Sequence, residues 1–340
     1  MICQEQTERQ TVTVAKTPEA SRLPRITLID TLRGVALVAM ASYHFTWDLE
    51  FFGYLDPGTA THGFFRIYAR SIASTFLFLA GVSLVLAHTP AIRWRSFWNR
   101  FAVVAGAALA ISIATFFAFP TEWIYFGILH NIAVSSLIGL AFLRPPAIVT
   151  SLAVLVVVAA MVADYSLAPD ILETPLFDTR VLSWIGFADV PPRSNDYVPL
   201  FPWIAALLAG IALTRLASKR GWLTRLAGVQ TEPNLLSKAG RHSLVIYLLH
   251  QPILIGLVYL FSLVHPAPPP DPRVGYVMSC QTSCQNTGGE EAICQRFCGC
   301  TADKLIAQQL MTPLQTGAIQ AQDDRIQAIA EECSIGAQLP

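Results

Sequence analysis

Long apolar runs alternate with short polar joints over most of the chain. An α-helix needs about 20 residues to cross the hydrocarbon layer of a membrane, and seven of the runs reach about that length. The pattern therefore predicts an all-α fold, a polytopic membrane helix bundle of about seven spans. We expect these spans at residues 28–50, 66–87, 100–119, 123–142, 147–168, 198–217 and 242–264.

Composition supports a membrane protein and argues against a nucleic-acid partner. The 340 residues are 53% hydrophobic and only 14% charged, whereas a soluble domain carries about 25% charged residues. The formal net charge is zero, and no basic block with interleaved aromatic residues is present to bind nucleic acid.

Basic residues gather in alternate joints, and this distribution predicts the orientation. The N-terminal arm and the joints after spans two, four and six are basic, while the other joints are poor in Lys and Arg. We therefore expect the N-terminus in the cytoplasm and, after an odd number of spans, the C-terminus in the periplasm. The basic residues are Arg9, Lys16, Arg22, Arg25, Arg93, Arg95, Arg100, Arg144, Lys219, Arg220, Arg225, Lys238 and Arg241.

The chain divides into a cytoplasmic arm (1–25), a membrane domain (26–264), a Pro-rich linker (265–273) and a Cys-rich tail (274–340). Four tail cysteines form two C-x3-C pairs, each with two thiols one helical turn apart, and a Thr-Gly-Gly turn separates the pairs. An even number of cysteines outside the cytoplasm favours a disulfide-stapled helical hairpin, with Cys300 pairing with Cys333 on a following helix. A zinc site is the alternative, although C-x2-C is the more usual zinc spacing. The six cysteines are Cys280, Cys284, Cys294, Cys298, Cys300 and Cys333.

Four polar side chains mark the first span: Asp30, Arg33, His44 and Asp48. At 100° per residue, Arg33 and His44 lie within about 20° of one line along the helix, and the aspartates about 60° from it. A charged side chain at the bilayer centre costs roughly 2.5–3.5 kcal/mol, so such a stripe normally faces a bundle interior or an aqueous cavity. The stripe is therefore the first candidate site.

Four motifs carry a resemblance to a known family. They are IDTLRGVALVAMASYHFTWD at 29–48, YFGILHNIA at 125–133, LFPW at 200–203 with Gly210, and GRHSLVIYLLHQP at 240–252. In this order they resemble the bacterial members of the heparan-α-glucosaminide N-acetyltransferase catalytic-domain family, within the transmembrane acyltransferase superfamily. The resemblance covers roughly residues 25–264 and leaves out the Cys-rich tail.

The resemblance implies a membrane-integral acetyltransferase in a bacterial inner membrane. It would move an acetyl group from cytoplasmic acetyl-CoA, a co-substrate, to a sugar-like acceptor on the periplasmic side, with no metal. Superfamily relatives pair an Arg and a His with ten residues between them on the first span, and Arg33 and His44 match that spacing. In the lysosomal branch the catalytic histidine instead follows the first span, where this chain has His62, so both histidines remain candidates.

Acetyl transfer needs a general base, oxyanion donors and cations for the CoA phosphates. His44 suits the base by residue type, and Asp48, one turn away, could orient its imidazole. Arg33 lies about 16 Å from His44 towards the cytoplasm, so Arg33 and Asp30 are the predicted cofactor-binding residues. The structural alternative is an interfacial Asp30–Arg33 ion pair, with His44 as a hydrogen-bonded bundle residue.

Further candidates for substrate binding lie on later spans. Arg66 and Arg70 follow His62 at helical spacing, and either pair with Asp48 and Glu50 or meet an acidic acceptor. The structural pairing is slightly favoured. Two more motifs could line a central cavity or simply pack as satisfied polar groups, and they supply His130, Asn131 and His250.

Two other function classes compete with the enzyme. Intramembrane polar residues also suit a small-molecule transporter or exporter, although the two halves show no repeat. A non-enzymatic envelope assembly factor, with the tail binding a periplasmic partner, is the third class. The expected partners are membrane lipids and a carbohydrate or glycolipid acceptor, and a homodimer is left open.

Overall fold

The computed structural model describes residues 26–166, 171–228, 234–268 and 271–338. Within these ranges the regular structure is helical, and the one β-type contact is an isolated bridge between Phe126 and Tyr197. The predicted N-terminal arm, 1–25, lies outside the described residues.

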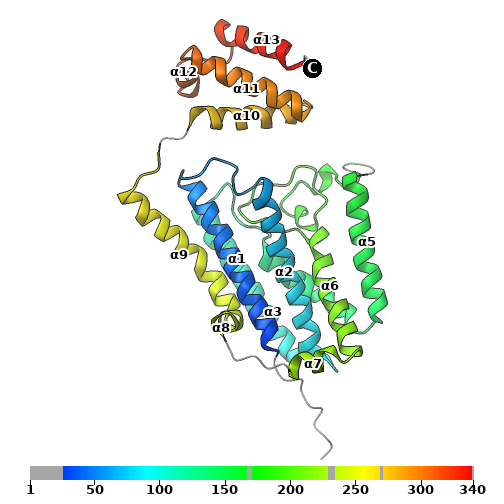
Figure 1. The fold of residues 1–340 in the computed structure, drawn as a ribbon. Coiled ribbons are helices and arrows are strands. Elements are labelled where there is room, and N and C mark those ends of the chain that lie inside the picture. The colour runs from blue at the N-terminus through cyan, green and yellow to red at the C-terminus, as the bar shows by residue number, and fades with distance from the viewer. Residues whose placement is uncertain (1–25, 167–170, 229–233, 269–270, 339–340) are drawn as a thin grey trace, which may run out of the picture.

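Each of the seven predicted runs overlaps one helix of the bundle (Figure 1). Two short helices, α7 (Trp222–Gly228) and α8 (Leu235–Arg241), lie between the last two, at the end of the bundle where the first begins. The seven are α1 (Thr27–Phe51), α2 (Gly63–His88), α3 (Trp94–Ala118), α4 (Ile128–Gly139), α5 (Ala147–Ser166), α6 (Leu200–Lys219) and α9 (Ser243–Val264).

Among the described residues, five helices are long and apolar enough to cross a membrane: α2, α3, α5, α6 and α9. α1 carries polar side chains along its length. α4 has 12 residues and continues only through the 3-10 turn η1 (Leu140–Phe142). Five candidate spans are therefore established, and the count of seven stays a prediction.

The centre of the bundle is the α2–α6 pair. In the most apolar 18-residue stretch of each helix, 56% of the residues of α2 and 50% of those of α6 are buried. The corresponding shares in α3, α5 and α9 are 11%, 17% and 6%. Leu77 of α2 meets Leu207 and Ile211 of α6 in the core, and all three are fully buried. The outer helices leave leucines and valines exposed, as expected of surfaces that face lipid.

Glycines allow α2 and α6 to approach closely. A Cβ added at Gly81 would lie 2.1 Å from the Leu207 carbonyl oxygen, and one at Gly210 would lie 2.2 Å from that of Phe78. Without a hydrophobic force between helices in lipid, such close van der Waals contact is what holds them together.

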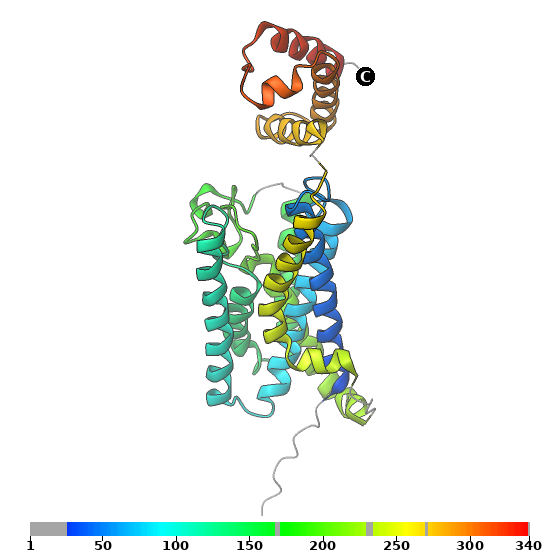
Figure 2. The ribbon, with the colours of Figure 1, turned by 90° about the vertical axis from the view of Figure 1, so that its left-hand side faces the viewer.

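The tail forms a separate helical unit beyond the end of the bundle opposite α7 and α8 (Figures 1 and 2). Its helices are α10 (Pro272–Asn286), α11 (Glu291–Ala307), α12 (Met311–Gln315) and α13 (Asp324–Gln338). Disulfides Cys280–Cys298 and Cys284–Cys294 staple the α10–α11 hairpin, and Cys300–Cys333 ties α11 to α13. The predicted hairpin and the Cys300–Cys333 pair are confirmed. All six thiols are used in disulfides, so the zinc alternative is not realised.

Candidate active site

Two histidines that are far apart in the sequence, His44 of α1 and His250 of α9, meet between these two helices. The Nδ1 atom of His44 lies 2.6 Å from Nε2 of His250. Their rings are nearly parallel, with planes 13° apart and centroids 4.8 Å apart. The structure thus joins the predicted base to a predicted substrate-binding residue in one pair.

The sequence around His250 fixes the direction of its ring. Nδ1 of His250 lies 2.7 Å from the carbonyl oxygen of Tyr247, one turn earlier in α9. Pro252 lies inside the same helix and has no N–H to donate to the carbonyl of Leu248. The ring therefore folds back against its own helix and presents Nε2 to α1.

Asp48 and Gln251 form a second polar contact between the same two helices. Nε2 of Gln251 donates to Oδ1 of Asp48 at 2.7 Å, and Asp48 is fully buried. The orientation of the His44 ring is therefore set by His250 instead of the expected Asp48. Gln251 is not among the predicted site residues, and its place directly after His250 is the only sequence signal for it.

His62 lies in the joint between α1 and α2 and is exposed. Its Nδ1 is 3.0 Å from the Gly58 carbonyl oxygen and 3.0 Å from the Thr61 hydroxyl. The carboxylate of Glu50 holds this joint by accepting from the backbone N–H groups of Gly58 and Ala60, at 2.6 and 2.7 Å. The contacts of His62 are thus local, whereas His44 lies in the bundle.

Arg66 and Arg70 are exposed on the first turns of α2. In the described part of the chain neither forms an ion pair, and the carboxylates of Asp48 and Glu50 are held by other groups. The favoured structural pairing was therefore wrong. Binding of an acidic acceptor by these arginines remains a prediction.

Asp30 and Arg33 form the ion pair that the structural alternative describes. Nη1 of Arg33 lies 2.9 Å from Oδ1 of Asp30, and Nη2 of Arg33 donates to the Ser83 hydroxyl of α2. Arg241 of α8 approaches the other oxygen of Asp30 at 3.7 Å. These contacts join three helices at one end of the bundle, and a CoA-binding role for Asp30 and Arg33 stays a prediction.

Both polar atoms of the Asn131 side chain form hydrogen bonds within the protein. It is fully buried, its Nδ2 donates to the carbonyls of Val198 and Pro199 at 3.1 and 2.7 Å, and its Oδ1 accepts from Ser135 at 2.7 Å. These contacts tie α4 to the segment that precedes α6. They support the structural alternative for this predicted substrate-binding residue.

His130 likewise has a local set of partners. Its Nδ1 accepts from the Gly127 N–H at 3.2 Å, and its Nε2 lies 3.1 Å from the Ser112 hydroxyl. That hydroxyl donates its own hydrogen to the Ile124 carbonyl, so the His130 ring donates to it. Both ring nitrogens are satisfied, which again supports a packing role.

Asp196 is a loop carboxylate that the sequence did not single out and that contacts the start of α4. Its Oδ2 accepts from the N–H of Ile128 at the start of α4, at 3.0 Å. A Cβ at Gly127 would lie only 2.3 Å from that oxygen, so a larger residue there would displace the Asp196 carboxylate. Burial raises the pKa of Asp196 to about 6, although the Ile128 hydrogen bond acts in the lowering direction.

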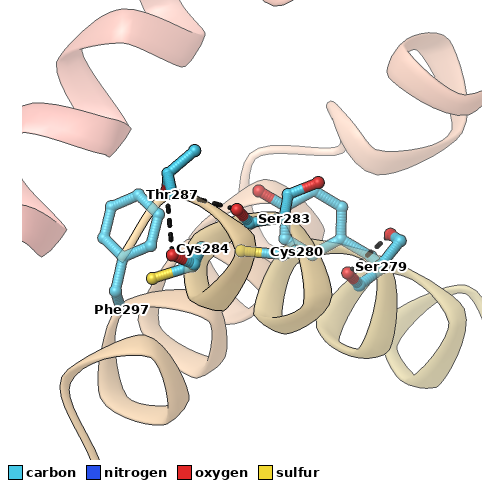
Figure 3. A pocket seen from close by; sticks show the side chains of 7 residues that line it. Ser279, Cys280, Ser283, Cys284, Thr287 and Phe297 are labelled. Carbon is cyan, nitrogen blue, oxygen red and sulfur yellow. Dashed lines mark hydrogen bonds between the residues drawn. The ribbon is translucent and has the colours of Figure 1, made fainter. Parts of the chain in front are cut away.

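Two pockets lie away from the histidine pair. A pocket of about 520 Å³ at the start of α3 is lined by Arg93, Trp94, Arg95, Ser96 and Asn99. Another, of about 450 Å³, lies in the tail (Figure 3), where its walls carry aromatic rings, hydroxyls and disulfide sulfurs. The lining of the tail pocket comprises Tyr276, Ser279, Cys280, Ser283, Cys284, Thr287 and Phe297.

Comparison with known proteins assigns the membrane domain. Residues 25–252 match the family model described as heparan-alpha-glucosaminide N-acetyltransferase, catalytic. The match includes the four motifs and both members of the histidine pair, and ends before the Cys-rich tail. No curated protein and no solved structure matches the chain. With about two thirds of its length matched, the chain belongs to the heparan-alpha-glucosaminide N-acetyltransferase catalytic-domain family.

Proposed function

We propose that the protein transfers an acetyl group from acetyl-CoA to a hydroxyl or amine of a sugar-like acceptor, an envelope glycan or glycolipid, with His44 as general base. Membership of an acetyltransferase family supports the reaction class. The observation that carries the residue assignment is the His44–His250 pair inside the bundle, because an imidazole there has a lone pair and, within the described ranges of the chain, His44 forms no ion pair.

The chemistry needs one proton acceptor at the reacting centre. His44 takes the proton from the acceptor's O–H or N–H as the acceptor's oxygen or nitrogen attacks the thioester carbonyl. The C–S bond then breaks, and the proton passes to the sulfur of the leaving CoA. His62, held in an exposed joint by Gly58 and Thr61, is the less suitable base.

The two ends of the bundle differ in charge, and this suggests where each substrate enters. The end formed by the joint between α2 and α3 and by α7 and α8 holds many of the basic side chains, which the positive-inside rule places in the cytoplasm of a bacterial inner membrane. Acetyl-CoA would enter there. The acceptor would enter from the periplasmic end, where the tail lies.

The pocket at the start of α3 is a candidate for the CoA phosphates. Arg93 and Arg95 line it, and the unpaired N–H groups of a helix N-terminus favour anions. Trp94 and Trp98 are exposed in the same turn, so this segment also suits an anchor in the lipid headgroups. Arg33, the predicted phosphate ligand, is half-buried and already bound to Asp30 and Ser83.

An acetyl-transfer assay tests the proposal. Purified protein in lipid is mixed with labelled acetyl-CoA and an extract of envelope glycolipids, and the label is followed into the extract. The proposal predicts label in the acceptor fraction together with stoichiometric release of CoA. Labelled acetyl-CoA or a small solute that crosses sealed vesicles without any acetyl transfer would support the transporter class and contradict the proposal.

A further inference from the structure

His250 has two contacts that determine where the protons of the histidine pair lie. Its Nδ1 lies 2.7 Å from the backbone carbonyl oxygen of Tyr247, and its Nε2 lies 2.6 Å from Nδ1 of His44. A carbonyl oxygen can only accept, so Nδ1 of His250 carries a hydrogen. A neutral imidazole has one N–H, and Nε2 of His250 is therefore an acceptor without hydrogen.

The same reasoning passes to His44. Its Nδ1 lies 2.6 Å from the unprotonated Nε2 of His250, and two unprotonated nitrogens at this distance would repel each other. Nδ1 of His44 must then carry the hydrogen and donate it to His250. This leaves Nε2 of His44 as the one ring nitrogen of the pair with a free lone pair.

We propose that His250 is a positioning residue that holds His44 in the Nδ1–H tautomer and makes Nε2 of His44 the atom that accepts the acceptor's proton. The catalytic part of this inference rests on the proposed function, whereas the tautomer follows from the contacts alone. When Nε2 takes the proton, the Nδ1–H of the resulting imidazolium still donates to His250, which helps to stabilise the charge.

A neutral partner suits this position in a membrane. A carboxylate in the place of His250 would add a second buried acidic group to Asp48, at a substantial desolvation cost. The nearby carboxylate, Asp48, is bound to Gln251. The histidine pair therefore fixes a tautomer without an ion pair.

Nitrogen-15 NMR of the full chain in lipid measures the tautomer directly, with no substrate present. The chain has seven histidines, so His44→Ala and His250→Leu identify the two signals by difference. We expect Nδ1 protonated and Nε2 bare on both rings. In His250→Leu the signal of His44 should shift to the Nε2–H form or to a mixture, whereas His250→Gln, whose Oε1 can occupy the place of Nε2, should keep Nδ1–H.

Kinetics then test the positioning role. His250→Leu should lower kcat at least about tenfold, by analogy with the partners that orient metal-bound histidines, whose loss costs about 10–100-fold. The KM for acetyl-CoA should stay within about twofold. His250→Gln should restore most of kcat. Far-UV circular dichroism and thermal unfolding confirm that both variants fold.

The outcomes separate this inference from the proposed function. A wild-type His44 with Nε2–H and a bare Nδ1 would overturn the inference, even if acetyl transfer depends on His44. Full activity of His250→Leu would overturn the positioning role. If the tautomer is as expected but the protein transfers no acetyl group, the proposed function fails and the assignment of the hydrogens stands.

Discussion

Replacing the side-chain amide of Asn131 with a carboxylate tests whether this residue packs the bundle or binds substrate. Asn131→Asp keeps the shape of the side chain and the acceptor for Ser135, but replaces Nδ2 with an oxygen. That oxygen would face the carbonyls of Val198 and Pro199, now 3.1 and 2.7 Å from Nδ2. Two buried hydrogen bonds become two contacts between acceptors.

The magnitude follows from those contacts. Interhelical hydrogen bonds in membrane proteins contribute about 0.6 kcal/mol each on average, and a buried carbonyl left without a donor costs about 1–3 kcal/mol. Because Asn131 is fully buried, water cannot replace the lost donor. With two carbonyls left without a donor, we expect Asn131→Asp to lower the free energy of unfolding by about 2–6 kcal/mol. The control Ser135→Ala leaves one buried acceptor, Oδ1 of Asn131, without its donor, so it should cost less, about 1–3 kcal/mol.

Thermal unfolding in one detergent, followed by circular dichroism, compares the two variants with the wild type. Acceptor KM is measured on the folded fraction below the transition. A lower melting temperature with an unchanged KM supports the packing role. A wild-type melting temperature together with a raised acceptor KM would refute the reasoning and return Asn131 to the substrate site.

Three further changes have defined outcomes. Gly81→Ala should weaken the α2–α6 contact and lower the melting temperature by several degrees, because its Cβ would meet the Leu207 carbonyl, whereas Gly106→Ala, with open space around it, should not; equal effects would contradict the packing argument. The pKa of Asp196 in the folded protein, about 6, lies above the ordinary 3.8. The contribution of this carboxyl group to the free energy of unfolding is therefore fully present below about pH 4 and is lost as the pH rises through 6. Asp196→Asn should therefore stabilise the protein above pH 6, by at most about 3 kcal/mol. If the variant melts no higher than the wild type above about pH 6, burial does not destabilise the ionised carboxylate. The six tail cysteines should resist alkylation until a reductant is added, and mass spectrometry that finds them free in native protein would contradict the disulfide framework.

The length and spacing of apolar runs were enough to place the bundle helices, because each helix is a local consequence of its own composition. The disulfide hairpin was equally readable, since two C-x3-C pairs around a glycine turn specify adjacent short helices. Two of the seven predicted spans, α1 and α4, are not among the five established candidates. α1 carries the polar stripe, and α4 is short because it begins after Gly127 and ends at a 3-10 turn.

The site was predicted less completely, for reasons of distance along the chain. His44 and His250 are each visible as polar residues in apolar helices, but their pairing depends on how α1 and α9 pack. Asp48 was assigned to His44 from helical spacing, whereas Gln251 on another helix binds it. Asp196 lies in a loop without a motif, and only the folding of that loop onto α4 brings it to the bundle.

The rate of CoA release with acetyl-CoA and acceptor, compared between His44→Ala and His62→Ala, tests the central claim most directly. The account predicts that His44→Ala abolishes acetyl transfer, whereas His62→Ala, whose ring contacts only its own joint, retains most of it. Transfer that survives in His44→Ala and is lost in His62→Ala would contradict the assignment of the base.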